Sequence, residues 1–261
     1  MLSYGMVEFK HNMKEEGAAM SQTHKKSIRL LMHVLRRLMP HTIKERENVR
    51  LDESDPVVYL CNHSEMYGPI AGMLYCPGFV RPWTISELCC DPQEATAYVK
   101  RYTLKNVTWK DKTKQRVARF LAANTLKLMQ GVQSIPVFRH KPRELMNTFR
   151  QSVEALQQGA NLLIFPEDPD TDPSSPGYKA GRPPTLFPGF PMLAQVYYNR
   201  TGKCCRFIPM LCHKTGRTVS FGTEIVYNPD NDPIAERDRI VDETYHQMQA
   251  LYEREEALCN A

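Results

Sequence analysis

The chain has 261 residues, of which 42% are hydrophobic and 24% charged, as in a globular protein with a sizeable core. Its net charge of +5 favours anionic partners. The sequence has no zinc-finger spacing, RNA-binding aromatic strand or dense basic tail, so we expect no nucleic-acid partner. The eight cysteines form no CxxC pair, so we expect reduced thiols and no metal site.

No run of residues approaches the ~20 apolar positions needed to cross a bilayer. The start of the chain also lacks an apolar run followed by a small-residue cleavage site, so no secretion signal is expected. These two observations predict a cytoplasmic protein, or one on the cytoplasmic face of a membrane.

A basic amphipathic helix is predicted after a polar segment of about twenty residues. Apolar residues recur at steps of three and four from Ile28 to Met39, with cationic residues between them, and Pro40 marks the end. Such a helix can lie in an anionic membrane interface or pack on its own domain with a solvated basic face, and both interpretations stay open. We assign 1–49 to an N-terminal arm containing this helix and 50–261 to one α/β domain.

Strands and helices alternate from residue 57 onward. Short apolar runs bounded by turn residues predict strands at 57–61, 80–85, 135–138, 161–165, 207–211 and 218–226. One-sided apolar periodicity predicts helices at 115–129, 142–158, 192–198 and 234–258. In 115–129 we expect the inward side chains to be Val117, Phe120, Leu121 and Leu128. The alternation predicts an α/β domain with a mixed, mostly parallel sheet flanked by helices.

Four short segments at strand positions are candidates for a site. His63, in the run Asn62-His63-Ser64-Glu65, follows the first of these strands, where α/β enzymes place catalytic groups, and neutral imidazole can accept a hydroxyl proton. Arg139 follows the strand at 135–138 and could hold a phosphate through two hydrogen bonds. Glu167, in Phe165-Pro166-Glu167, could bind a substrate hydroxyl, orient the histidine or cap the following loop. The fourth segment, Phe207-Ile208-Pro209, suits a site wall. Taken singly, each segment also fits a purely structural role.

Together, the four segments resemble the lysophosphatidate acyltransferase-like glycerolipid acyltransferases over roughly residues 50–230. In that family the order is Asn-His with an aspartate five positions after the histidine, a Gly…Ile…Arg block, Phe-Pro-Glu-Gly, and an Ile-Pro-Val-like strand. The matching segments here are Asn62-His63, Gly131 to Arg139, Phe165-Pro166-Glu167 and Phe207-Ile208-Pro209.

The resemblance implies an O-acyltransferase of phospholipid biosynthesis. His63 would act as general base on the hydroxyl of a lysophospholipid-type acceptor such as 1-acylglycerol 3-phosphate. That hydroxyl would attack the thioester of acyl-CoA or acyl-carrier protein, a co-substrate, and no cofactor or metal is implied. Arg139 would hold the acceptor's phosphate, Glu167 would help to bind its glycerol part, and Asn62 would be a further substrate-binding residue.

The sequence departs from the family pattern after the histidine. Gly68 stands five residues after His63, where the family has the aspartate that fixes the imidazole tautomer and stabilises the imidazolium. Glu65 is the nearest carboxylate that could replace it as a catalytic partner, and Glu167 is another.

A second departure follows Phe-Pro-Glu, where Asp168 and a long polar loop stand instead of a glycine. Lys179 and Arg182 on this loop could supply positive charge near a substrate phosphate. Two alternatives to an acyltransferase stay open: a catalytically impaired lipid-binding or regulatory protein on the same scaffold, and an ester or thioester hydrolase. The hydrolase lacks support because the sequence has no Gly-x-Ser-x-Gly nucleophile motif.

Overall fold

The computed structural model describes residues 28–50, 56–64, 66–138, 142–168 and 185–260. The chain divides into two compact units, Met1–Pro40 and His41–Ala261. In the first unit, residues 28–38 are helical. No helix in the described ranges is both long enough and apolar enough to cross a membrane.

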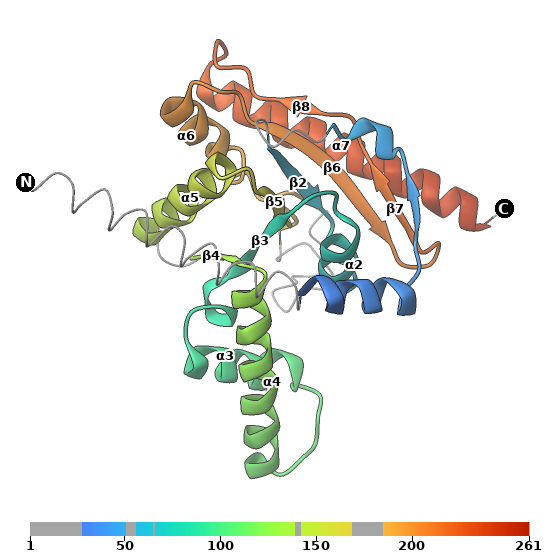
Figure 1. The fold of residues 1–261 in the computed structure, drawn as a ribbon, viewed down its shortest axis with the longest axis vertical. Coiled ribbons are helices and arrows are strands. Elements are labelled where there is room, and N and C mark those ends of the chain that lie inside the picture. Colours follow the sequence, from blue (N-terminus) through green and yellow to red (C-terminus); the bar gives the residue numbers. More distant parts are fainter. Residues whose placement is uncertain (1–27, 51–55, 65, 139–141, 169–184, 261) are drawn as a thin grey trace, which may run out of the picture. The chain divides into compact units, whose positions relative to one another are not determined.

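The second unit contains one mixed sheet. The strands that the structure describes are β1 (Thr42–Lys44), β2 (Val57–Cys61), β3 (Val80–Ile85), β4 (Ile135–Val137), β5 (Asn161–Ile164), β6 (Arg206–His213), β7 (Thr218–Phe221) and β8 (Ile225–Val226). Their order is β1-β7-β6-β2-β5-β3-β4, with β8 paired to β6 (Figure 1). Only the pairings of β6 with β7 and β8 are antiparallel among these strands, so the predicted mostly parallel α/β sheet is confirmed. β1 belongs to this unit, although its residues fall in the range predicted as the N-terminal arm.

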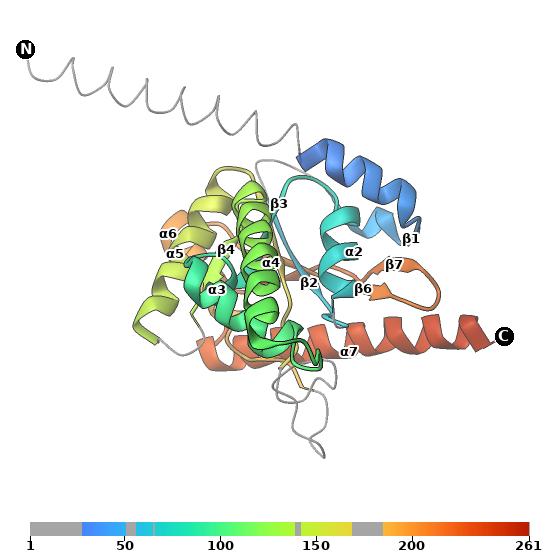
Figure 2. The same cartoon turned by 90° about the horizontal axis from the view of Figure 1, so that it is seen from below.

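Helices cover both faces of the sheet. The helices of this unit are α2 (Tyr67–Tyr75), α3 (Pro92–Tyr98), α4 (Asp111–Gly131), α5 (Pro142–Gln157), α6 (Met192–Thr201) and α7 (Pro233–Asn260). Side chains of α5, α6 and α7 share one apolar cluster with the sheet, and α2 packs in a second cluster. Figure 2 shows α2 and α7 on opposite sides of the sheet.

The central strand β2 is covered on both faces, which explains why its sequence is a continuous run of apolar residues. Val58 and Leu60 point into the cluster with α5 and α6, whereas Tyr59 and Cys61 point into the cluster with α2. All five residues of β2 are fully buried. A parallel strand covered on both faces needs apolar side chains at every position, not at alternate ones.

Several elements differ from their predicted bounds. The strand predicted at 218–226 is two strands, β7 and β8, and the sequence patterns did not reveal β1, α2 or α3. α2 is hard to recognise because it is apolar on most sides and buries two glycines. α3 does carry a start signal, since the Asp91 side chain accepts hydrogen bonds from the backbone amides of Gln93 and Glu94.

The buried face of α4 is only partly the predicted one. Val117 and Leu121 pack against the small core between α3 and α4, as expected. Phe120 and Leu128 were expected to point inward, but their side chains are 68% and 41% exposed. The buried residues are Ala118, Ala122 and Leu126, which pack against α3. Small alanines one turn apart allow two helices to approach closely, so Ala118 and Ala122 face α3 while Phe120 and Leu128 stay outside.

Unfolding measurements can check this assignment. Phe149, on α5, is 1% exposed in the main core, so Phe149→Ala should lower the free energy of unfolding by about 3–5 kcal/mol through the cavity it leaves. Phe120→Ala should change it by less than about 0.5 kcal/mol, because an exposed ring loses little packing. Equal losses in urea denaturation would contradict the exposed position of Phe120.

Candidate active site

The register of β2 and β5 brings two sequence-predicted residues to one place. The two strands are parallel and Leu60 lies opposite Ile164. His63 and Glu167 each follow three residues later, so they leave the same edge of the sheet at the same level. The backbone N–H of His63 donates a hydrogen bond to Glu167 Oε2 at 2.5 Å, across 104 residues of sequence.

Glu167 is held in place by the chain that follows it. Its backbone forms an isolated antiparallel bridge with Leu186. On either side, the backbone N–H of Phe187 donates to the Pro166 carbonyl at 2.7 Å, and that of Asp168 donates to the Thr185 carbonyl at 2.9 Å. Glu167 therefore extends from a short two-stranded ladder beyond β5, with its carboxylate on the His63 backbone.

The imidazole of His63 is half-buried against an aromatic ring. The centroids of the His63 and Phe165 rings lie 5.6 Å apart, and the ring planes meet at 76° in an edge-on arrangement. The Nδ1 atom is shielded from solvent. Phe165 thus limits the orientations that the imidazole can adopt.

Asn62 connects the start of this loop to β6. Its amide Nδ2 donates to the Cys212 carbonyl at 3.1 Å, and the Cys212 backbone N–H donates to Asn62 Oδ1 at 2.7 Å. The side chain is 8% exposed. These two hydrogen bonds anchor the loop to β6 through Asn62. The role of Asn62 in binding a substrate stays a prediction.

Gly68 is required by the turn that follows His63. The turn contains Ser64 at φ 40°, and the Gly68 backbone N–H donates to the His63 carbonyl at 3.1 Å. A Cβ atom on residue 68 would lie 2.0 Å from the Asn62 carbonyl oxygen and 2.6 Å from that of His63. No side chain fits there without movement of the backbone, so this turn cannot carry the aspartate of the family pattern at this position.

Four of the predicted site residues cannot be placed. Glu65, Arg139, Lys179 and Arg182 lie outside the described residues. Their roles as catalytic partner or phosphate ligands stay predictions. Among the residues that the structure describes, no group of three or more His, Cys, Asp or Glu side chains could hold a metal ion.

A second histidine, His213, lies beside the loop and pairs with a glutamate, and the sequence analysis did not find this pair. His213 ends β6, and its Nδ1 accepts a hydrogen bond from the Gly216 backbone N–H at 3.2 Å. Its Nε2 therefore carries the proton and donates to Glu256 Oε1 on α7 at 2.9 Å. Both side chains line a small open pocket with Asn62 and Ser64. A histidine at a strand end was the available signal, whereas nothing in the sequence relates Glu256 to it.

The Cys61 thiol beside the loop is a poor nucleophile. Cys61 directly precedes Asn62, and its Sγ atom lies 3.7 Å from that of Cys212. Burial, together with the Cys212 thiol, raises the pKa of Cys61 well above its ordinary value. A buried, protonated thiol does not attack a thioester, so Cys61 does not fit the role of a nucleophile.

Comparisons with known proteins add no family to this geometry. No protein-family model matches the chain, and no curated protein matches it.

The requirement for glycine at position 68 can be tested against a second glycine of α2. Gly68→Ala should lower the free energy of unfolding by about 2 kcal/mol or more, because the new methyl group meets rigid backbone carbonyls. Gly72→Ala is the matched control. Its Cβ would touch only side-chain atoms, at 3.3 Å or more, and replacing a helical glycine regains up to about 1 kcal/mol. Urea denaturation in which Gly68→Ala is as stable as Gly72→Ala would contradict the close approach.

Proposed function

We propose that this chain is an O-acyltransferase. It moves a fatty acyl group from an acyl-CoA or acyl-carrier-protein thioester to the hydroxyl of a lysophospholipid-type acceptor such as 1-acylglycerol 3-phosphate. The observation that carries the proposal is the contact between His63 and Glu167 at the carboxyl edge of the sheet. These residues belong to the Asn-His and Phe-Pro-Glu segments on which the family resemblance rests.

The proposed reaction uses the His63 imidazole as general base. It takes the proton of the acceptor hydroxyl while that oxygen bonds to the thioester carbonyl carbon. The tetrahedral intermediate then collapses, the C–S bond breaks, and the imidazolium returns its proton to the departing thiolate. Glu167 positions the backbone of His63, and the edge-on ring of Phe165 limits rotation of the imidazole.

The proposal assigns the remaining tasks by chemistry. The cationic Arg139, Lys179 and Arg182 bind the acceptor's phosphate, since guanidinium and ammonium groups suit that anion. Glu65 is the proposed partner of the imidazole, because residue 68 has no room for a carboxylate. Glu167 is the weaker candidate, since one of its oxygens already accepts a hydrogen bond from the His63 backbone.

Gly68 also favours a second candidate function. If no carboxylate replaces the family's aspartate, the chain is a catalytically impaired lipid-binding or regulatory protein on the same scaffold. Loss of the carboxylate's charge from a serine-protease triad lowers turnover about 10⁴-fold, so such a chain would bind lipid with little turnover.

An acyl-transfer assay with 1-acylglycerol 3-phosphate separates the two candidates. His63→Ala should lower kcat by about 10²–10⁴-fold, the usual contribution of a general base. Glu167→Gln should lower it less, since a neutral amide oxygen still accepts the His63 N–H, though more weakly. The control His246→Ala removes an exposed histidine of α7 and should leave kcat unchanged. Full activity of His63→Ala would exclude the proposed base, and binding of lysolipid without turnover in wild type would favour the second candidate.

We further propose that the chain acts at the cytoplasmic face of a membrane, with the helix at residues 28–38 lying in the interface. Replacing Arg29, Arg36 and Arg37 with glutamate should reduce flotation with anionic liposomes, because cations near such a surface each contribute about 1 kcal/mol. Unchanged flotation of this variant would exclude the helix from membrane attachment.

A further inference from the structure

Residues 92–131, from the start of α3 to the end of α4, form what we call the α3–α4 lobe. The lobe projects away from the sheet (Figure 1). It has its own small apolar core, to which both helices contribute: Ala95, Val99, Leu104, Ala118, Ala122 and Leu126. Because these residues satisfy the packing between the helices, the outer face of α4 is not needed to hold the lobe together.

The positive charge of the whole chain is concentrated in this lobe. Residues 92–131 contain nine lysines and arginines but only two acidic residues, a net charge of +7, whereas the entire chain carries +5. An ion pair of 2.8 Å joins Lys100 to Asp111. The exposed cationic residues are Arg101, Lys105, Lys110, Lys112, Arg116, Arg119 and Lys127. The rest of the chain therefore carries a net negative charge, and the lobe is a strongly cationic region that attracts an anionic surface.

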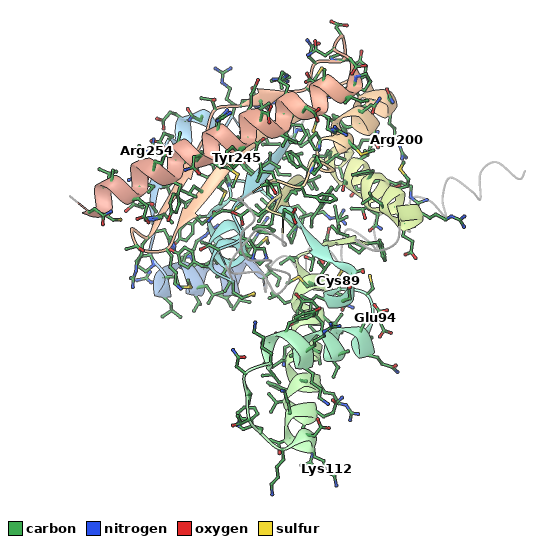
Figure 3. The ribbon with its side chains drawn as sticks, turned by 180° about the vertical axis from the view of Figure 1, so that it is seen from behind. Cys89, Glu94, Lys112, Arg200, Tyr245 and Arg254 are labelled. Atoms are coloured by element: carbon green, nitrogen blue, oxygen red, sulfur yellow. The ribbon has the colours of Figure 1, made fainter. Side chains whose placement is uncertain are left out.

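Two exposed aromatic side chains accompany these cations. Trp109 is 51% exposed and lies next to Lys110, just before α4 begins. Figure 3 shows Lys112 at the end of the lobe farthest from the sheet, with Cys89 at its base. Phe120 is 68% exposed and follows Arg116 by one helical turn, so both lie on the outer face of α4.

We propose that the α3–α4 lobe docks on an anionic phospholipid bilayer. Trp109 enters the headgroup region, the position that tryptophan favours at membrane surfaces, and the lysines and arginines contact lipid phosphates. Proteins that bind single-stranded nucleic acid hold it in a groove with stacking aromatics. Here the cations and aromatics lie on the outside of a projecting helix pair, which fits a bilayer better. The inference goes beyond acyl transfer and does not depend on it.

Tryptophan fluorescence reports directly on this contact, because the chain has two tryptophans. In Trp83→Phe the emission comes from Trp109 alone. Adding vesicles of phosphatidylcholine mixed with phosphatidylserine should shift this emission to shorter wavelength, and brominated acyl chains should quench it. Pure phosphatidylcholine vesicles, or high salt, should abolish both effects. The matched control is Trp109→Phe, which leaves Trp83, whose Nε1 donates to Ser152 Oγ at 2.9 Å, and its emission should not change.

Charge removal gives the second measurement, by vesicle sedimentation of the full chain. Each lysine or arginine near an anionic bilayer strengthens binding about fivefold, so Lys112→Gln with Arg116→Gln should weaken it about 25-fold. Arg200→Gln with Lys203→Gln removes the same charge at the end of α6, and Figure 3 shows Arg200 far from the lobe. This control should bind like wild type.

Three results would overturn the proposal. One is unchanged Trp109 emission with anionic vesicles, and another is equal vesicle binding by the lobe variant and the α6 control. The third is a lobe variant that keeps vesicle binding but loses binding to single-stranded RNA, which would make the lobe a nucleic-acid surface. All of these measurements report binding and need no turnover, so their results do not depend on whether the chain is an active acyltransferase. Trp109 and the four substituted lysines and arginines are exposed, and matching far-UV circular dichroism spectra confirm that all the variants, including Trp83→Phe, are folded.

Discussion

β2 pairs in parallel with β5 on one side and with β6 on the other, and the registers of these two ladders determine where the site lies. Because Leu60 lies opposite Ile164, His63 and Glu167 lie at the same level of the sheet edge, and the Glu167 carboxylate accepts a hydrogen bond from the His63 backbone N–H. The pairing of Cys61 with Met210 similarly brings Asn62 beside Cys212. A slip of one residue in either ladder would turn the side chains of a strand to the opposite face and separate these partners.

Local patterns predicted most of the sheet and its flanking helices, and strand ends pointed to His63 and Glu167 as candidates for a site. Glu167 was named as a possible partner of His63, but the contact of its carboxylate with the His63 backbone could not be predicted, because it depends on the register of two strands about a hundred residues apart. The hydrogen bond between His213 and Glu256 could not be predicted for a similar reason, since it joins the end of β6 to a residue of α7 that is 43 positions later in the sequence. From the sequence, Gly68 indicated only that the family's aspartate is absent. The structure shows why glycine is needed there, since a Cβ atom would meet the carbonyl oxygens of Asn62 and His63.

The face of α4 illustrates a different limit. Hydrophobicity alone favoured burial of Phe120 and Leu128, but the helix buries Ala118 and Ala122 against α3. Small side chains gain packing when the helix axes approach closely, which a sequence pattern does not reveal. Phe120 and Leu128 are left outside near cations, and this arrangement gives the lobe its proposed affinity for a bilayer. The proposed catalysis at the sheet edge and the proposed attachment through the lobe therefore involve separate segments of the chain.

The central claim is that His63 and Glu167 belong to a site that transfers an acyl group instead of only binding lipid. The most direct test follows thiol release from acyl-CoA by the wild-type chain, with and without 1-acylglycerol 3-phosphate, and measures the new ester by mass spectrometry. For an acyltransferase, thiol release should require the acceptor and should equal the amount of ester formed. Thiol release without the acceptor would indicate a hydrolase. Absence of release from every acyl-CoA and acyl-carrier-protein donor would contradict the transferase assignment.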